Sequence, residues 1–186
     1  SYAQDNSGTS AEDLAKQLAN PVASLISVAF QNTFDCNVGP TKVFQYSLNV
    51  QSVIPIDLSE NWNLISRTIL PFISQSDIFI DGDSQTGLGD IAQSIFFSPK
   101  EPTENGLIWG AGPILLLPIA TNDAPGGNKW AAGPNAVFLK LQGAYTYGGL
   151  GNHMWSYAGD GSDISASILQ PFVTYATPSG TSYTVA

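Results

Sequence analysis

Residues 42–58 read KVFQYSLNVQSVIPIDL, and along most of this stretch apolar side chains alternate with polar ones. Phe44, Tyr46, Leu48 and Val50 hold even positions, and the residues between them are polar. A period of two is typical of a β-strand whose two faces meet different environments. The stretch is two to three times longer than the roughly 5–6 residues of an ordinary strand. Long strands of this kind, joined by short turns, predict a membrane-spanning β-barrel.

The composition agrees with a chain that exposes few charges to water. Charged residues make up 11% of the 186 residues and hydrophobic residues 43%, whereas soluble domains are about 25% charged. The net charge of −9 argues against a nucleic-acid partner, because phosphate binding requires a basic surface. Cys36 is the only cysteine. An internal disulfide and a thiolate metal cluster are therefore excluded, and we interpret Cys36 as an apolar strand residue.

The longest apolar run, residues 107–120, reads LIWGAGPILLLPIA. It is shorter than the roughly 20 residues of a spanning helix, and Pro113 and Pro118 would interrupt a helix. As a strand, it places large apolar residues on one face and Gly110 and Gly112 on the other. We therefore expect a strand with small inward-facing residues.

The whole pattern predicts an all-β chain: an antiparallel transmembrane β-barrel, or an incomplete segment of one, with a short N-terminal amphipathic helix. We assign residues 1–20 to a tail and this helix, which Ser10 caps and Asn20 and Pro21 end. We read the tail as the mature N-terminus left after signal removal. Residues 21–186 form the barrel strands. The expected strands cover about 23–38, 42–58, 62–75, 87–99, 107–121, 129–142, 144–158 and 163–177, with a ninth starting at Ser182.

The expected strand ends carry many aromatic residues, which suits the interfacial girdles of a barrel. The alternative is an ordinary sandwich core. The connections also differ in length. SDIFIDGDSQTG (76–87), NDAPGGNK (122–129) and GDGSD (159–163) are the ones expected to face outward, whereas SEN, QG and PSG are short enough for the periplasmic side.

No catalytic constellation stands out, so we expect neither an enzyme nor a cofactor or metal site. His153 is the only histidine and is interpreted as an interfacial or lumen residue. Neither a G-x-S-x-G elbow nor a phosphate-binding loop is present. The segment 81–90, DGDSQTGLGD, has the oxygen-rich character of a calcium loop, but it lacks the final bidentate Glu. A solvated acidic loop is the favoured interpretation, with calcium binding as the alternative.

Arg67 is the only arginine and lies in the middle of an apolar strand. A lipid-facing cation there would cost about 2–4 kcal/mol, so we expect the side chain to face the interior. Asp57 and Asp90 are candidate counter-charges on neighbouring strands. The two interpretations that remain open are a structural interior ion pair and a residue that contacts the solute.

Several ordered segments resemble the bacterial outer-membrane transporter family of the MetA pathway of phenol degradation, some of whose members carry the name neuromedin U. They are residues 20–40, 53–73, 87–100, 106–121, 129–134 and 152–160. The resemblance runs from about Ala11 to the end of the chain. It implies an outer-membrane β-barrel that passes small, often apolar or aromatic, solutes, and it carries no catalytic residues over. Members of the family continue for further strands beyond the region that matches the end of this chain, so the barrel is expected to lack those strands.

The sequence therefore favours a non-enzymatic channel of the cell outer membrane, with lipid around it and a small-molecule solute inside. The expected lumen-lining residues are Gln45, Asn49, Gln51, Arg67 and Asp90. The alternative function is a structural or surface-assembly β protein that associates through exposed strand edges. In either case, an oligomer or a partner chain could complete the sheet.

Overall fold

The computed structural model describes residues 26–38, 43–75, 85–121, 128–160, 162–179 and 181–186. For residues 35–38, 43–45, 75 and 85 it describes the backbone only. Within these ranges the chain is entirely β-strand, turn and irregular structure. No helix in them is long and apolar enough to cross a membrane. The N-terminal helix expected within residues 1–20 and most of the acidic segment 81–90 lie outside the described residues.

The described residues form ten strands in a single antiparallel sheet. Their bounds are β1 Ser27–Val38, β2 Val43–Asp57, β3 Trp62–Gln75, β4 Gln85–Leu88, β5 Ile91–Pro99, β6 Leu107–Leu117, β7 Lys129–Gln142, β8 Tyr145–Gly159, β9 Ser165–Ala176 and β10 Ser182–Val185. Strands follow one another in chain order from β1 to β10, except that the short β4 pairs with β3 beside β5.

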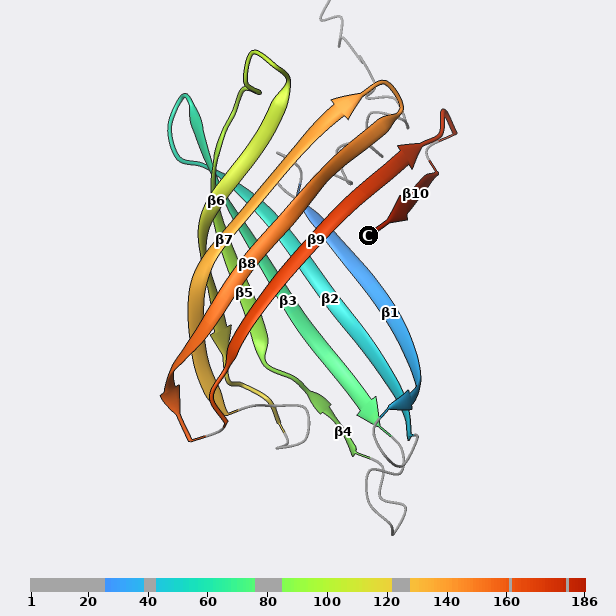
Figure 1. Ribbon diagram of the computed structural model, residues 1–186, viewed down its shortest axis with the longest axis vertical. Coiled ribbons are helices and arrows are strands. Elements are labelled where there is room, and N and C mark those ends of the chain that lie inside the picture. Colours follow the sequence, from blue (N-terminus) through green and yellow to red (C-terminus); the bar gives the residue numbers. More distant parts are fainter. Residues whose placement is uncertain (1–25, 39–42, 76–84, 122–127, 161, 180) are drawn as a thin grey trace, which may run out of the picture.

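The sheet is curved into a half-barrel (Figure 1). It turns through β5 and β6, so that β7, β8 and β9 lie opposite β1, β2 and β3. Among the described strands, β1 pairs only with β2, and β10 pairs only with the last four residues of β9. The sheet is therefore open between its first and last strands. This architecture confirms the all-β antiparallel prediction and is that of an incomplete β-barrel.

The strand limits follow local sequence signals closely. The predicted strands 62–75 and 129–142 match β3 and β7 in full. The predicted strand 87–99 is divided into β4 and β5, because Gly89 and Asp90 leave the ladder between them. β6 ends at Leu117, directly before Pro118, which has no backbone N–H for the ladder.

The concave face carries the buried core, which the register connects from strand to strand. Ile65 in β3 lies opposite Phe96 in β5, and Val137 in β7 lies opposite Leu150 in β8. These residues form one buried cluster with Leu139. A second, smaller cluster contains Ile114, Ala131 and Met154.

Glycine allows the strands on this face to approach closely. A Cβ atom on Gly112 would lie 2.1 Å from the carbonyl oxygen of Ile95 on the neighbouring strand. Gly110 and Gly112 pair with Val137 and Asn135 of the concave face, so the predicted placement of small residues on the inward side of this strand is confirmed. Their lack of side chains leaves room for the core beside them.

The convex face carries most of the exposed large apolar side chains. Its large exposed residues include Val28, Phe30, Phe34, Ile54, Ile56, Trp62, Phe72, Phe97, Leu107, Trp130, Phe138, Tyr145, Tyr147, Trp155, Leu169, Val173, Tyr175, Tyr183 and Val185. Soluble monomers rarely expose a contiguous apolar surface of this kind. The sheet thus packs one face against itself and presents an apolar face outward.

Candidate functional site on the concave face

Arg67 lies in the middle of β3, paired in register with Val53 of β2 and Ser94 of β5. It shares the concave face with Ile65, two residues before it. Its Nη2 atom donates a hydrogen bond to Oε1 of Gln51 at 2.9 Å. The expectation that this arginine faces the interior agrees with this placement.

A row of amides continues from Arg67 across β2 to the edge of the sheet. Gln51 Nε2 donates to Oε1 of Gln31 in β1 at 2.8 Å. Each Gln51 amide atom therefore has a defined partner, with the oxygen turned to Arg67 and the nitrogen to Gln31. This arrangement orients the guanidinium, because the Gln51 amide cannot rotate without losing both bonds.

Polar groups also line the concave face beyond Arg67. Asn135 in β7 is 3% exposed, and its Nδ2 atom donates to Oγ of Ser94 at 2.9 Å. The Oδ1 atoms of Asn135 and Asn152, which pair in register, are buried and accept no hydrogen bond from the residues that the structure describes. Buried acceptors of this kind are costly. The middle of the half-barrel is thus polar, between two apolar clusters.

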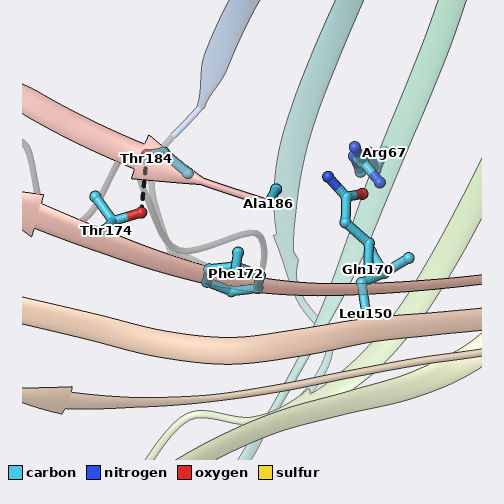
Figure 2. Close-up of a pocket in the computed structure, with 7 residues that line it drawn as sticks. All are labelled: Arg67, Leu150, Gln170, Phe172, Thr174, Thr184 and Ala186. Carbon is cyan, nitrogen blue, oxygen red and sulfur yellow. Dashed lines mark hydrogen bonds between the residues drawn. The ribbon is translucent and has the colours of Figure 1, made fainter.

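A cavity of about 180 Å³ lies between Arg67 and the opposite wall of the half-barrel. Strands β8 and β9 contribute Leu150, Gln170, Phe172 and Thr174 to its lining. Figure 2 shows Gln170 extending from β9 toward Arg67, while Phe172 and Thr174 lie further along the same strand. The cavity is completed by Thr184 and Ala186, and the Thr174 and Thr184 hydroxyl oxygens lie 2.9 Å apart in a hydrogen bond.

The other predicted lumen-lining residues are spread along the sheet. Asn49 lies in β2 opposite Gln31 and Pro71, on the same face as Gln51. Gln45 is also in β2, opposite Asp35 and Gln75, but its side chain lies outside the described part. Asp90 lies at the loop end of the half-barrel between β4 and β5, where its Oδ1 accepts a hydrogen bond from the backbone N–H of Ala120 at 3.2 Å. Of the five, the structure brings Gln51 and Arg67 into direct contact.

The charged partner expected for Arg67 is replaced by a neutral amide. Asp57, one candidate, forms an ion pair with Lys100 instead, with 2.6 Å between Nζ and Oδ1. Lys129 pairs with Asp163 at 3.1 Å. Both pairs are at strand ends, where exposed acids can reach lysines on another strand. Within the described ranges, Arg67 forms no ion pair with a carboxylate.

His153 belongs to the convex face of β8. Its Nδ1 atom lies 2.6 Å from Oγ of Ser167, and its ring centroid is 4.0 Å from that of Trp155. This position places the imidazole away from the concave site, while the interfacial interpretation of His153 stays a prediction. The described residues include no group of three or more His, Cys, Asp or Glu side chains that could hold a metal ion.

Sequence reasoning did not identify Gln170, Thr174 or Ser94 as members of the site. In β9 the residues 165–176, SASILQPFVTYA, mix polar and apolar side chains on both faces. Their inward parity becomes visible only when Thr146 and Leu150 of β8 are paired with Thr174 and Gln170. The sequence of β9 alone therefore does not indicate which of its residues face inward, and the pairing with β8 is needed to assign them.

No protein-family model, curated protein or solved structure matches the chain.

Proposed function

We propose that this protein is a non-enzymatic channel of the outer membrane, in which the concave face lines a passage for small solutes and the convex face contacts lipid. The observation that carries the proposal is the distribution of side chains over the two faces. Apolar residues are exposed on the convex face, and the arginine with its amide network is on the concave face. A soluble sheet protein also buries apolar residues on its inner face, but it rarely exposes this many large apolar residues on its outer face.

Aromatic residues at both ends of the convex face support this proposal. At the end that holds the short turns, Trp62 meets Trp109 edge-on with ring centroids 5.9 Å apart, and Tyr145 lies 5.1 Å from Tyr175. At the opposite end, which carries the longer loops, Phe34 lies 5.0 Å from Tyr46, and the exposed Trp130 and Trp155 belong to the same end. Two aromatic belts separated by an aliphatic zone suit the two interfaces of a bilayer.

Polar residues within the aliphatic zone bond to one another. Thr68 Oγ1 donates to Oε1 of Gln93 at 2.6 Å, and Gln93 Nε2 donates to Oγ of Ser66 at 2.9 Å. A polar group in hydrocarbon costs several kcal/mol unless it is hydrogen-bonded. The pairing lowers that cost, which is the arrangement expected if this face contacts lipid.

The resemblance of several segments to the outer-membrane transporter family of phenol degradation also supports a passive role. In that reading the solutes are small and often apolar or aromatic, and the half-barrel is completed by further strands. The partners would be outer-membrane lipid and a small-molecule solute, with no nucleic acid.

A second candidate function is a structural β protein that assembles through its strand edges. The observation in its favour is the open sheet, because β1 and most of β9 have one unpaired edge among the described strands. Exposed edges are templates for pairing with another chain. The same edges would also accept the remaining strands of a closed barrel.

Refolding into lipid vesicles followed by conductance measurement tests the channel directly. We expect the protein to fold in detergent or vesicles, to shift its gel mobility on heating, and to produce discrete conductance steps in a planar bilayer. A protein that folds in buffer without detergent and forms ordered assemblies would support the structural alternative. Folding in vesicles without any conductance would contradict a passage for solutes.

A further inference from the structure

We propose that the cavity beside Arg67 binds a small carboxylate that carries a compact apolar body. The inference deepens the channel proposed above by naming the class of solute, and for the route by which the solute arrives it rests on that function. The binding itself can be measured without any conductance.

The charge of Arg67 is the first argument. A guanidinium has five N–H groups, and the structure uses one nitrogen, Nη2, for a bond to the neutral Gln51. None of the described carboxylates forms an ion pair with it. A cation inside a protein is costly unless an opposite charge compensates it. A ligand carboxylate would supply that charge in the planar two-point geometry that arginine favours.

The opposite wall supplies a second donor. Gln170 extends toward Arg67 in the same cavity (Figure 2), and its side-chain amide forms no hydrogen bond with any described residue. The amide N–H groups of Gln170 can therefore donate to a carboxylate held by Arg67. A phosphate, with nearly two negative charges at neutral pH, would be poorly compensated because Arg67 is the only cation among the described residues of the lining.

The remaining lining selects the body of the ligand. Leu150 is 7% exposed, and Phe172 packs against the same core cluster. The cavity volume of about 180 Å³ is close to the roughly 150 Å³ at which an apolar protein cavity accommodates benzene. Benzoate, with one carboxylate on one ring, therefore matches both the charge and the size of the site.

The test is titration calorimetry of the folded protein in detergent micelles with benzoate and with benzamide, its neutral counterpart of the same shape. We expect benzoate to bind at least about tenfold more tightly than benzamide, because a hydrogen bond to a charged group is lost with the amide. Arg67→Gln should abolish this preference. Lys140→Gln, which removes the same charge from the convex end of β7, should leave it unchanged.

Gln51→Glu provides a variant that keeps the arginine. It places a carboxylate oxygen where Oε1 of Gln51 now lies, 2.9 Å from Arg67 Nη2, and this internal acid should compete with the ligand. We expect benzoate affinity to fall about tenfold or more. Glutamate loses the hydrogen bond that Gln51 donates to Gln31, but the new ion pair with Arg67 offsets this loss. Folding should therefore be preserved, so this variant decides the question if Arg67→Gln does not fold.

The possible outcomes separate the two proposals. Equal binding of benzoate and benzamide, or benzoate binding that neither Arg67→Gln nor Gln51→Glu weakens, would overturn the carboxylate site. Conductance without benzoate binding would overturn this inference and leave the channel standing. Benzoate binding without conductance would support the carboxylate site and overturn the proposed channel.

Discussion

Arg67 illustrates how neighbouring amides accommodate a charge that the local sequence leaves without an acid. The guanidinium is held by Gln51, which in turn is held by Gln31. Residues from three adjacent strands, β1, β2 and β3, therefore fix the orientation of the Arg67 side chain. This type of network fixes position without neutralising charge, so the charge remains available to whatever occupies the concave face.

The charge of Arg67 should influence ion selectivity. If the concave face lines a passage, Arg67→Gln should make it more selective for cations, because a fixed positive charge that repels them is removed. The measurement is the reversal potential across a planar bilayer under a salt gradient. Lys140→Gln is the control, since it changes the net charge equally at a convex position. An identical reversal potential for wild type and Arg67→Gln would place the arginine outside the ion path.

Adjacent positions on β2 should respond differently to a new charge. Leu48 pairs with Asn32 and Phe72 of the convex face, whereas Asn49 pairs with Gln31 and Pro71 of the concave face. If the convex face contacts lipid, Leu48→Arg would expose a cation to hydrocarbon, and we expect it to lower the free energy of unfolding in vesicles by about 2–4 kcal/mol. Asn49→Arg should cost much less. Denaturant titration in vesicles compares the two, and equal losses would contradict the assignment of faces.

Among the strands, β6 shows why glycine is needed on the inward side of a strongly curved sheet. The strand places Trp109, Ala111 and Pro113 outward, and Gly110 and Gly112 inward. Phe96 of β5 is completely buried beside this strand. The curvature that carries β7 and β8 across from β2 and β3 therefore depends on positions where no side chain separates the backbones.

Two glycine substitutions test this explanation. A Cβ atom on Gly112 would lie 2.1 Å from Ile95 O, whereas one on Gly151 would meet Leu169 Cδ1 at 3.6 Å, an ordinary contact. Gly112→Ala should destabilise the folded protein by about 1–3 kcal/mol through overpacking. Gly151→Ala should be neutral or slightly stabilising, because alanine restricts the unfolded chain. Heat-induced mobility shifts on gels provide the readout, and similar midpoints for both variants would refute the role of Gly112.

At the scale of the whole molecule, two features of the open sheet can contact other molecules: the convex face and the edges of the outer strands. The convex face exposes many large aromatic and aliphatic side chains. Among the described strands, β1 and most of β9 each pair with only one neighbour, so their other edges can accept a further strand. In the channel proposed above, a bilayer would cover the convex face, and additional strands, from the same or another polypeptide, would pair with the strand edges.

The tryptophans can be used to test whether the convex face contacts lipid. Trp62, Trp109, Trp130 and Trp155 are the four tryptophans of the chain, and all four lie on the convex face near strand ends. After refolding into vesicles, lipids brominated near the headgroups should quench their fluorescence more strongly than lipids brominated at the chain ends. Acrylamide in the aqueous phase should quench weakly. Strong acrylamide quenching with no effect of brominated lipid would mean that the convex face is not lipid-exposed.

The linear pattern of residues was enough to predict most of the strands and the two faces of β2 and β6, although it joined β4 and β5 into one strand and extended β6 past Leu117. Strand alternation depends on residues two positions apart, and turn residues act over a few positions, so both can be recognised from the sequence alone. Gln51 and Arg67 were predicted as interior residues on these grounds. The residues that contact them were not predicted, because strand register and sheet curvature bring together residues that are far apart in the chain. Ser94 and Asn135 are hydrogen-bonded across 41 positions, and Gln170 reaches the cavity of Arg67 only because the sheet turns back on itself. Periodicity specifies the face on which a side chain lies, but it contains no information about which strand will face it across the half-barrel.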